Sequence, residues 1–473
     1  MNDDLLNHLR DAQDRHEHEP HSVPVIREIC RMLVALQRED AVLPWTEHGL
    51  ALEPHDPEFA GLRTDALNLA GRHAEAATFL MQERSLPWLP AMFQIKLGYS
   101  LMMAGDLERA VALLDEARHI ASASNPAVLT KATHLLGEAL LKRGDGRGFR
   151  FWTMRNEDSG AGGSYRAIGI PVWSGEQDLR GKRVLITHQL GYGDQFLLAA
   201  SLADFHAAGA TLMLTCDQQI HALMQASLPD VSVIWTKRPL EMGGPLPEDI
   251  RAEVAAFAPD FQATLLFAPI LANREGAPPY RFRPYMRPPA GKRQAAVEWS
   301  RQLRAQHPDK KLVGLFWDCE QRHHTEFGST MRCWAARRSI PLDLIDQLVL
   351  DPAVAKQVQF VNLHHPLLES TAGVPAGDVA RYSPGVFHFD DTAACIDQLD
   401  AVVSVDSGVA NLAAFMGKSA CVAVNTSGDW RWGSEGRSTP WIEGVTVLRQ
   451  KTEGDWAPVV RDIAAWLMHA SQG

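Results

Sequence analysis

The chain has 473 residues, of which 46% are hydrophobic and 22% charged, with a formal net charge of -11. This length allows about two to four domains, and the negative charge argues against non-specific binding of nucleic acid, which needs clustered Lys and Arg. No apolar run reaches membrane-spanning length, and the polar, acidic amino terminus has no signal-peptide core, so we expect a cytoplasmic protein.

The cysteines are scattered and form no C-x-x-C pair. In a chain of this size they indicate reduced, mostly buried thiols and no disulfide framework. One cluster contains residue types that bind zinc: Cys319, His323, His324 and Cys333. Its spacing matches none of the common zinc patterns, so we expect an irregular polar loop there and no metal.

Apolar residues from about 22 to 150 follow a helical spacing, and a period of 34 residues separates Gln37, Gly71 and Gly105. That is the tetratricopeptide period. A fourth unit repeats the phrase at Gly144, displaced by an insert around residues 122–126. We therefore predict four helix pairs in residues 1–155, stacked into a superhelix whose concave surface binds a peptide or protein. The alternative is that the repeats only form a homo-oligomer or brace the neighbouring domain.

Some aromatic and histidine residues of this region invite functional interpretations that we do not adopt. Trp45, Trp88 and Phe93 have helical spacing and are expected in the core. The histidines near the amino terminus are expected in a solvated segment; they are His16, His18 and His21.

A glycine-rich, polar stretch at residues 156–164 ends the helical pattern, and we assign residues 156–181 to a linker. Strand and helix patterns then alternate, which implies parallel sheets and an α/β class. A Pro- and Arg-rich passage at residues 280–293 divides the alternation, giving one doubly wound domain at 182–287 and another at 288–473. The predicted strands are 183–187, 211–215, 231–235, 261–267, 312–317, 358–363, 386–389, 401–405 and 420–424. The last helix, 456–469, is expected to pack across the pair.

The first strand leads into a glycine turn, Gly191-Tyr192-Gly193-Asp194-Gln195, and then into a helix. Such turns at the carboxyl ends of parallel strands are where ligands bind in open α/β sheets. Glycine allows a close approach of backbone N–H groups, and the helix start favours negative charge. Asp194 is therefore a candidate site residue. The alternative is that Asp194 only caps the helix.

A second turn in the last domain has the same plan, a buried strand followed by Asp406-Ser407-Gly408 and a helix that contains Asn411. Free N–H groups at the helix start and the Ser407 hydroxyl suit a diphosphate. Capping of the helix by Asp406 is again the alternative.

Three further residues are candidates for donor binding. Arg338, after a long loop, could grip a phosphate through a forked pair of hydrogen bonds, or else be a solvated loop arginine. Trp430 and Trp432 could stack on a base or a sugar, or else pack their loop against the domain. There is no G-x-x-x-x-G-K-[ST] motif, no third glycine of a dinucleotide fingerprint and no D-x-D. A nucleotide-sugar enzyme with this chain would work without a metal or cofactor, using helix dipoles and arginine.

These motifs together resemble the bacterial repeat-containing glycosyltransferases related to family 9, the heptosyltransferase-like group. The resemblance covers nearly the whole chain and rests on the repeats followed by VLITHQLGYGDQFLLAASLADF, RRSIPLDLIDQL and VVSVDSGVANLAAFMGKSACVAVNTSGDWRWG. It implies a GT-B fold, a nucleotide-sugar donor in the last domain, and inversion at the anomeric carbon. By resemblance, Asp194 matches the proposed general base, and Asp406, Ser407 and Gly408 match the donor-phosphate turn.

The chain departs from the family pattern at two places. Asn411 stands where the heptosyltransferases usually have histidine, and the loop 318–333 is longer and richer in histidine. The repeats favour a protein acceptor, such as a surface or flagellar protein, over lipopolysaccharide or another glycan. A non-catalytic repeat scaffold with a degenerate transferase half is the rival hypothesis.

Overall fold

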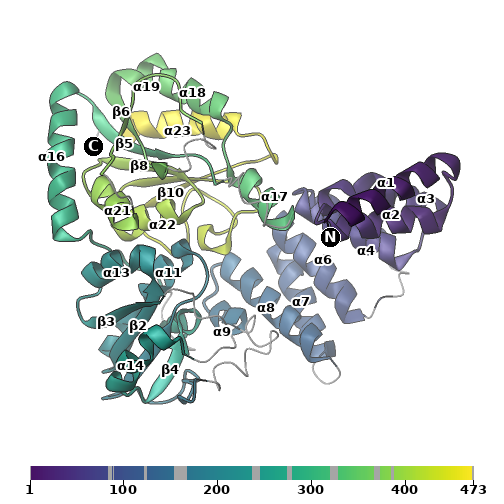
Figure 1. The fold of residues 1–473 in the computed structure, drawn as a ribbon, viewed down its shortest axis with the longest axis horizontal. Helices are drawn as coiled ribbons and strands as arrows, with labels where there is room; N and C mark the ends of the chain where they lie inside the picture. The colour runs from purple at the N-terminus through teal and green to yellow at the C-terminus, as the bar shows by residue number, and fades with distance from the viewer. Residues whose placement is uncertain are drawn as a thin grey trace. The chain divides into compact units, whose positions relative to one another are not determined.

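The computed structural model describes residues 2–83, 88, 90–121, 125–153, 168–236, 246–273, 280–319, 329–366, 373–384 and 388–470 (Figure 1). The chain forms two compact units. The helical unit comprises Met1–Leu135, Cys319–Ser339 and Thr452–Gly454. The α/β unit comprises Leu136–Asp318, Ile340–Lys451 and Asp455–Gly473. Residues 156–167 of the predicted linker, as well as His323 and His324 of the Cys/His cluster, lie outside the described residues.

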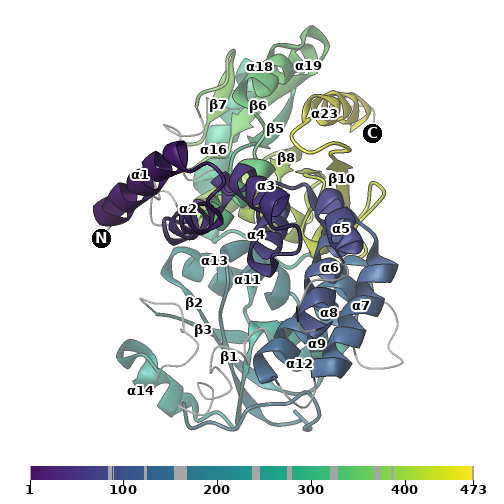
Figure 2. The same cartoon turned by 90° about the vertical axis from the view of Figure 1, so that its right-hand side faces the viewer.

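The amino-terminal region consists of paired helices, as the 34-residue period predicts (Figure 2). All four periodic positions have left-handed backbone, with φ of 54° at Gln37, 77° at Gly71, 93° at Gly105 and 86° at Gly144. Glycine occupies three of them because it adopts this conformation without steric cost, which closes the turn between paired helices. The helices are α1 (Asn2–His18), α2 (Val23–Ala35), α3 (Leu43–Leu52), α4 (Pro57–Leu69), α5 (His73–Gln82), α6 (Pro90–Ala104), α7 (Leu107–Ala121), α8 (Pro126–Lys142) and α9 (Gly148–Trp152).

Small residues allow the paired helices to approach closely. A Cβ atom added at Gly98 of α6 would come within 2.8 Å of the Leu114 side chain of α7. Leu114, Ala110 and Ala117 are fully buried on the facing helix. A larger residue at position 98 would therefore separate α6 from α7.

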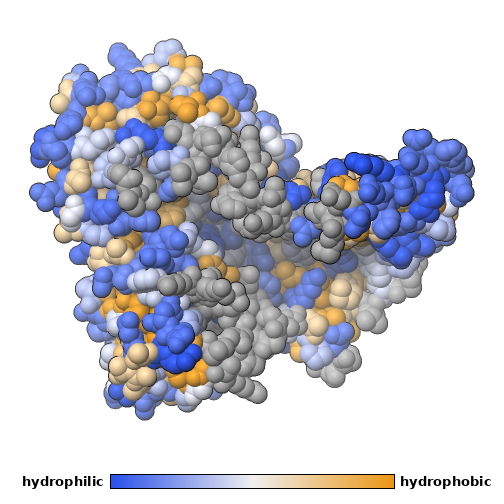
Figure 3. Space-filling view, viewed as in Figure 1, coloured by the Kyte–Doolittle hydropathy of each residue, from blue (hydrophilic) through white to orange (hydrophobic). Residues whose placement is uncertain are grey.

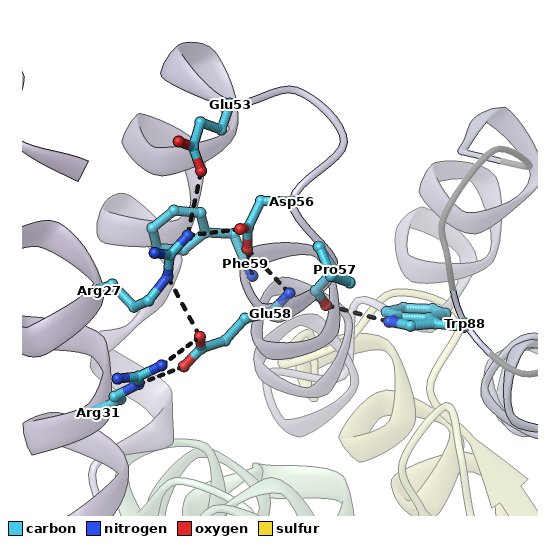
Figure 4. Close-up of polar contacts among 8 residues, drawn as sticks. All are labelled: Arg27, Arg31, Glu53, Asp56, Pro57, Glu58, Phe59 and Trp88. Carbon is cyan, nitrogen blue, oxygen red and sulfur yellow. Dashed lines mark hydrogen bonds and ion pairs between the residues drawn. The ribbon is translucent and has the colours of Figure 1, made fainter. Parts of the chain in front are cut away.

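Ion pairs connect α2 to the start of α4 (Figure 4). The Arg27 guanidinium of α2 lies 2.6 Å from a carboxylate oxygen of Asp56, which also caps α4 by accepting hydrogen bonds from its first N–H groups. Arg31, one helical turn later, pairs with Glu58 at 2.7 Å. The cap and the pairs fix the start of α4 against α2, in addition to the apolar packing between the helices.

The amino-terminal segment differs from the prediction, because residues 2–18 form helix α1 and pack on α2. The His16 ring lies 5.0 Å from the Trp45 ring, and burial, followed by the charges of His48 and His21, lowers the pKa of His16. His18 and His21 are exposed, as expected. Over the first helices, the face seen in Figure 3 is largely hydrophilic.

A segment that follows strand β5 (Lys311–Phe316) in the sequence groups with the repeats. Helix α17 (Ser329–Arg338) contacts α4, and its Arg337 pairs with Glu453 at 2.7 Å. The Gly71 turn packs against the Arg337 guanidinium, at 2.8 Å from the position that a Cβ atom would occupy. The helical unit is thus completed by two stretches from the second half of the chain.

The first sheet of the α/β unit has the parallel strand order β3-β2-β1-β4. The central strand β1 pairs with β2 on one side and with β4 on the other. The strands are β1 (Arg183–Thr187), β2 (Thr211–Asp217), β3 (Val231–Thr236) and β4 (Phe261–Thr264). The helices between and after them are α11 (Tyr192–Ala199), α12 (Leu202–Ala207), α13 (His221–Ser227), α14 (Glu248–Phe257) and α15 (Ala268–Ala272).

The second sheet is also parallel, in the order β10-β9-β8-β5-β6-β7. The strands are β5 (Lys311–Phe316), β6 (Val358–Asn362), β7 (Val379–Arg381), β8 (Ala401–Val405), β9 (Ala420–Val424) and β10 (Val445–Arg449). The helices are α16 (Ala290–Gln306), α18 (Leu342–Leu350), α19 (Pro352–Gln357), α21 (Phe389–Asp397), α22 (Gly408–Phe415) and α23 (Ala457–Ala470). The prediction lacked β7 and β10, and Phe389, predicted in a strand, begins α21.

One hydrophobic core runs through both sheets of the α/β unit, from Val184 and Phe196 to Val422 and Val447. The predicted class is confirmed: helical repeats are followed by two doubly wound parallel sheets, consistent with a GT-B-like architecture. Among the described helices, none has both the length and the apolar character needed to cross a membrane.

Candidate functional site

The first glycine turn connects β1 to α11 and places Asp194 in the first turn of that helix. The residue that caps α11 is Gly191, in extended conformation, and no side chain supplies a capping hydrogen bond. Asp194 therefore does not serve as the cap, and its carboxylate is directed to other partners. Its side chain is 23% exposed.

The second turn connects β8 to α22. Ser407 is the cap, and its hydroxyl accepts a hydrogen bond from the Ala410 N–H at 3.2 Å. The Ser404 hydroxyl lies 2.9 Å from the same oxygen. Asp406 precedes the cap and is buried at the carboxyl end of β8. Ser407, and not Asp406, therefore caps α22.

The two turns, which the sequence separates by more than 200 residues, lie against each other within the α/β unit. Figure 1 shows α11 and α22 adjacent, and a Cβ atom added at Gly193 would lie 3.0 Å from Asn411 Nδ2 and 3.4 Å from Gly408 Cα. Phe389 covers the junction, with its ring 4.9 Å from that of Tyr192. Absence of a side chain at position 193 makes this approach possible.

Arg431 bridges the junction. Its Nη2 donates to Asp194 Oδ1, its Nε donates to Asp429 Oδ1 at 2.8 Å, and its Nη1 donates to Asn411 Oδ1 at 3.4 Å. The Arg431 side chain is only 8% exposed. Burial alone would lower the pKa of Arg431, but the carboxylates of Asp429, Asp194 and Asp406 raise it by more, so the guanidinium remains charged.

Asn411 connects the guanidinium to α22. It is 1% exposed, and its Nδ2 donates to the Ser407 carbonyl at 2.8 Å while its Oδ1 accepts from Arg431. This residue therefore has a structural task at the position where the family usually has histidine. An amide can both donate and accept here at any pH, which a neutral imidazole does only in one tautomer.

The tryptophans predicted to stack on a donor are in the core. Trp430 is 2% exposed and Trp432 is fully buried. Trp430 packs edge to face on Phe149, Trp152 and Trp441, with ring centroids 5.5 to 5.8 Å apart. Both residues pack their loop against the domain, as the alternative interpretation proposed. The predicted stacking on a base or sugar does not fit their burial.

Arg338 belongs to a different unit from the donor turn. It lies at the end of α17 in the helical unit, with its guanidinium carbon 3.5 Å from the centre of the Trp334 ring. Arg431, which the sequence analysis missed, is the arginine that the fold places beside both turns.

A second polar cluster lies at the carboxyl ends of β1 and β2. Gln195, fully buried, donates from Nε2 to Asp217 Oδ2 at 2.7 Å, and His188 Nε2 lies 3.7 Å from Asp217 Oδ1. Burial would raise the pKa of Asp217, but the neighbouring His188 and the hydrogen bond from Gln195 lower it below its ordinary value. Asp217 therefore stays anionic, next to the helix that carries Asp194.

The helical unit contains a separate cavity of about 530 Å³ between α5, α6 and α7. Its lining is largely apolar, and Arg109, whose side chain is 54% exposed, lies at its rim. The lining residues are Met81, Phe93, Gln94, Leu97, Arg109, Ala112 and Leu113. Phe93, predicted in the core, is half-buried there.

Potential metal ligands do not gather in the part of the chain that the structure describes: no group of three or more His, Cys, Asp or Glu side chains is placed to hold an ion. The candidate site thus consists of carboxylates, an arginine and two helix starts. Metal independence remains a prediction from the sequence.

No known family model matches the chain. Among characterised sequences, Protein FlbA of Caulobacter vibrioides is 26% identical over 314 residues, which cover 62% of this chain and 48% of FlbA. The chain therefore spans about half the length of this curated relative.

Two solved structures illustrate the fold similarity. A family 9 glycosyl transferase from Veillonella parvula shares 14% identity over 61% of this chain and 91% of its own, with a TM-score of 0.39. The O-GlcNAc transferase of Thermobaculum terrenum shares 15% identity over 95% of this chain and 91% of its own, with a TM-score of 0.31. At these scores the functional argument rests on the residues of the site.

Proposed function

We propose that this chain is a glycosyltransferase that moves a sugar from a nucleotide-sugar donor to an acceptor hydroxyl at the junction of the two turns. The observation that carries the proposal is the direct contact between the Gly193–Asp194 turn and the Asp406–Gly408 turn. The motif resemblance assigns the base to one turn and the donor phosphate to the other. The fold brings the two assigned groups into one place.

In the proposed reaction, Asp194 removes the proton of the acceptor hydroxyl as its oxygen attacks the anomeric carbon. The bond from that carbon to the phosphate oxygen breaks, and the nucleoside diphosphate leaves with the electron pair. N–H groups at the start of α22 stabilise its charge. A single attack from the face opposite the leaving group inverts the anomeric configuration, and no metal is required in this scheme.

We propose a protein as the acceptor, docked on the helical repeats. Stacked repeats of this period usually bind peptides, and the cavity between α5, α6 and α7 has the volume for one or two apolar side chains. The exposed Arg109 at its rim would suit an acidic residue in the same peptide.

The test is a thermal-shift panel with UDP, GDP, ADP, CMP and their sugars on the wild type and on Gly408→Ala. The added methyl group fits the structure, because its nearest neighbour, Phe389, is 3.6 Å away. It would nevertheless block the approach of a phosphate to the first N–H groups of α22. Gly291→Ala, at the start of α16 with open space around it, is the matched control.

A ligand at a hundredfold its dissociation constant stabilises the folded state by about 2.7 kcal/mol, which is measurable. We expect one nucleotide to shift the melting temperature of the wild type and the control, and not that of Gly408→Ala. If Gly408→Ala keeps the full nucleotide-dependent rise in melting temperature, the donor binds elsewhere. No shift for any nucleotide at millimolar concentration would favour the non-catalytic scaffold.

A further inference from the structure

We infer that Arg431 exchanges Asp194 for the donor diphosphate when the donor binds, so that donor binding releases the base. This inference deepens the proposed function and rests on it. Arg431, which no sequence motif indicated, is then the cation that holds the leaving group. Asp194 becomes available as the base only when the donor is bound.

The backbone and Nε of Arg431 are fixed, whereas the far edge of its guanidinium bonds across the junction. Asp429 accepts from both the Arg431 backbone N–H, at 3.0 Å, and Nε, at 2.8 Å. The Thr439 hydroxyl donates to the Arg431 carbonyl. Only the two terminal nitrogens bond Asp194 and Asn411, and each of them keeps one further hydrogen. A change of partner therefore needs no movement of the anchored part.

The charges around Arg431 favour an exchange over simple addition of a ligand. Asp194, Asp429 and Asp406 all act on the one guanidinium. A diphosphate that entered with Asp194 still paired would add its negative charge next to a carboxylate. Transfer of the terminal guanidinium edge to the phosphate avoids this, since forked arginine–phosphate hydrogen bonds are among the strongest that proteins make.

The position of the guanidinium is suited to this role. Asn411 Oδ1 accepts from it, and Asn411 Nδ2 bonds the Ser407 carbonyl at the cap of α22. The cation thus lies one hydrogen-bonding residue from the helix start proposed to bind the diphosphate. The same guanidinium reaches Asp194 in α11, so both ends of the proposed reaction share it.

The exchange also fits the movement of the proton. The guanidinium occupies Asp194 Oδ1, so the exchange of partners frees that oxygen to receive the acceptor proton. Once Asp194 has taken the acceptor proton it is neutral and no longer attracts Arg431. The guanidinium then remains with the departing diphosphate, where the negative charge has developed.

The experiment is a double-mutant cycle read out by calorimetric binding of the nucleoside diphosphate that the thermal-shift panel selects. The proteins are the wild type, Asp194→Asn, Arg431→Gln and the double variant. Asp194→Asn should bind about three- to tenfold more tightly, because Arg431 no longer has a competing carboxylate, and Arg431→Gln should bind about tenfold or more weakly.

The decisive comparison is the effect of Asp194→Asn in the Arg431→Gln background. If the gain arises from partner exchange, it disappears there. If it persists undiminished, it reflects direct repulsion between Asp194 and the phosphate, and the inference is overturned. Equal affinity of Asp194→Asn and wild type would also overturn it, leaving a purely structural ion pair. Absence of binding to the wild type would instead refute the donor site, and with it the proposed function.

Two controls keep the cycle interpretable. Arg437→Gln removes an arginine whose side chain is 66% exposed and should leave binding unchanged. If Arg431→Gln does not fold, because the part-buried Asp429 loses its cation, Arg431→Lys replaces it. Lysine keeps the charge but donates from a single nitrogen and lacks the planar fork of arginine, so it should still weaken binding and reduce the gain from Asp194→Asn.

Discussion

The two strand–turn–helix junctions of the α/β unit share a plan and differ in how their helices begin. At α22, Ser407 caps the helix with its own hydroxyl, and Asp406 lies before the cap. At α11, Gly191 holds the cap position without a side-chain hydrogen bond, and Asp194 lies inside the first turn. The self-capped turn presents N–H groups, and the uncapped turn presents a carboxylate.

This difference shows why similar sequence phrases carry different chemistry. A carboxylate inside the first helical turn can bond a partner on another element, and Asp194 bonds Arg431. A hydroxyl cap fixes the helix start locally, which leaves the following backbone available to an anion. In the proposed reaction the first turn therefore handles the proton and the second holds the phosphate.

The largest expected effect comes from removing the carboxylate of the first turn. Asp194→Asn should lower the rate of sugar transfer by about 10²- to 10⁴-fold, the usual contribution of a general base. The rate is measured as nucleotide release from the selected donor with a cell-protein extract as acceptor source. Asp462→Asn, at a side chain 56% exposed, is the control. Full activity in Asp194→Asn would show that the general base does not lie in this turn.

An intermediate effect is expected at Asp217, which lies beside the first turn. Asp217→Asn should lower the free energy of unfolding by about 1–2 kcal/mol at pH 7. Because the folded-state pKa of Asp217 is lowered, its stabilisation is present above the ordinary value of 3.8 and is lost as the pH falls through the folded-state pKa.

Urea denaturation of the wild type and Asp217→Asn between pH 7 and pH 3 checks this prediction. The difference between the two proteins should close at acidic pH. The exposed Asp230→Asn provides the comparison and should match the wild type throughout. If the difference in the free energy of unfolding does not depend on pH, the charge of the Asp217 carboxylate contributes nothing to stability.

The smallest effects concern the caps themselves. Ser407→Ala should cost about 1 kcal/mol, since it removes the hydrogen bond to the Ala410 N–H. Gly191→Ser should instead stabilise the protein by a few tenths of a kcal/mol, by adding the cap that α11 lacks. Chemical denaturation measures both. If neither substitution changes the free energy of unfolding, the difference between the two caps does not contribute to stability.

Local signals in the sequence predicted much of this molecule. The 34-residue spacing located three left-handed turn positions of the repeats, and the repeated phrase located the fourth at Gly144, because the backbone conformation there restricts the residue type. Buried β-branched runs predicted most strands for the same local reason. Strand β7 was missed because its three residues carry little periodicity, and β10 was also missed.

Long-range contacts were beyond such reasoning. The pairing of Asp194 with Arg431 joins residues 237 positions apart, and no pattern near either one indicates it. Trp430 was assigned to ligand stacking because a loop tryptophan looks available, whereas its partners Phe149 and Trp152 come from α9. Likewise, only the fold shows that α17 carries Arg338 into the helical unit.

Hydrogen exchange measured by mass spectrometry, with and without the nucleoside diphosphate that the thermal-shift panel selects, tests the central claim most directly. If the two turns form one site, peptides covering residues 191–195 and 407–411 should both become protected, while peptides from the repeats should not change. Protection of neither turn, or protection confined to other parts of the chain, would contradict the account.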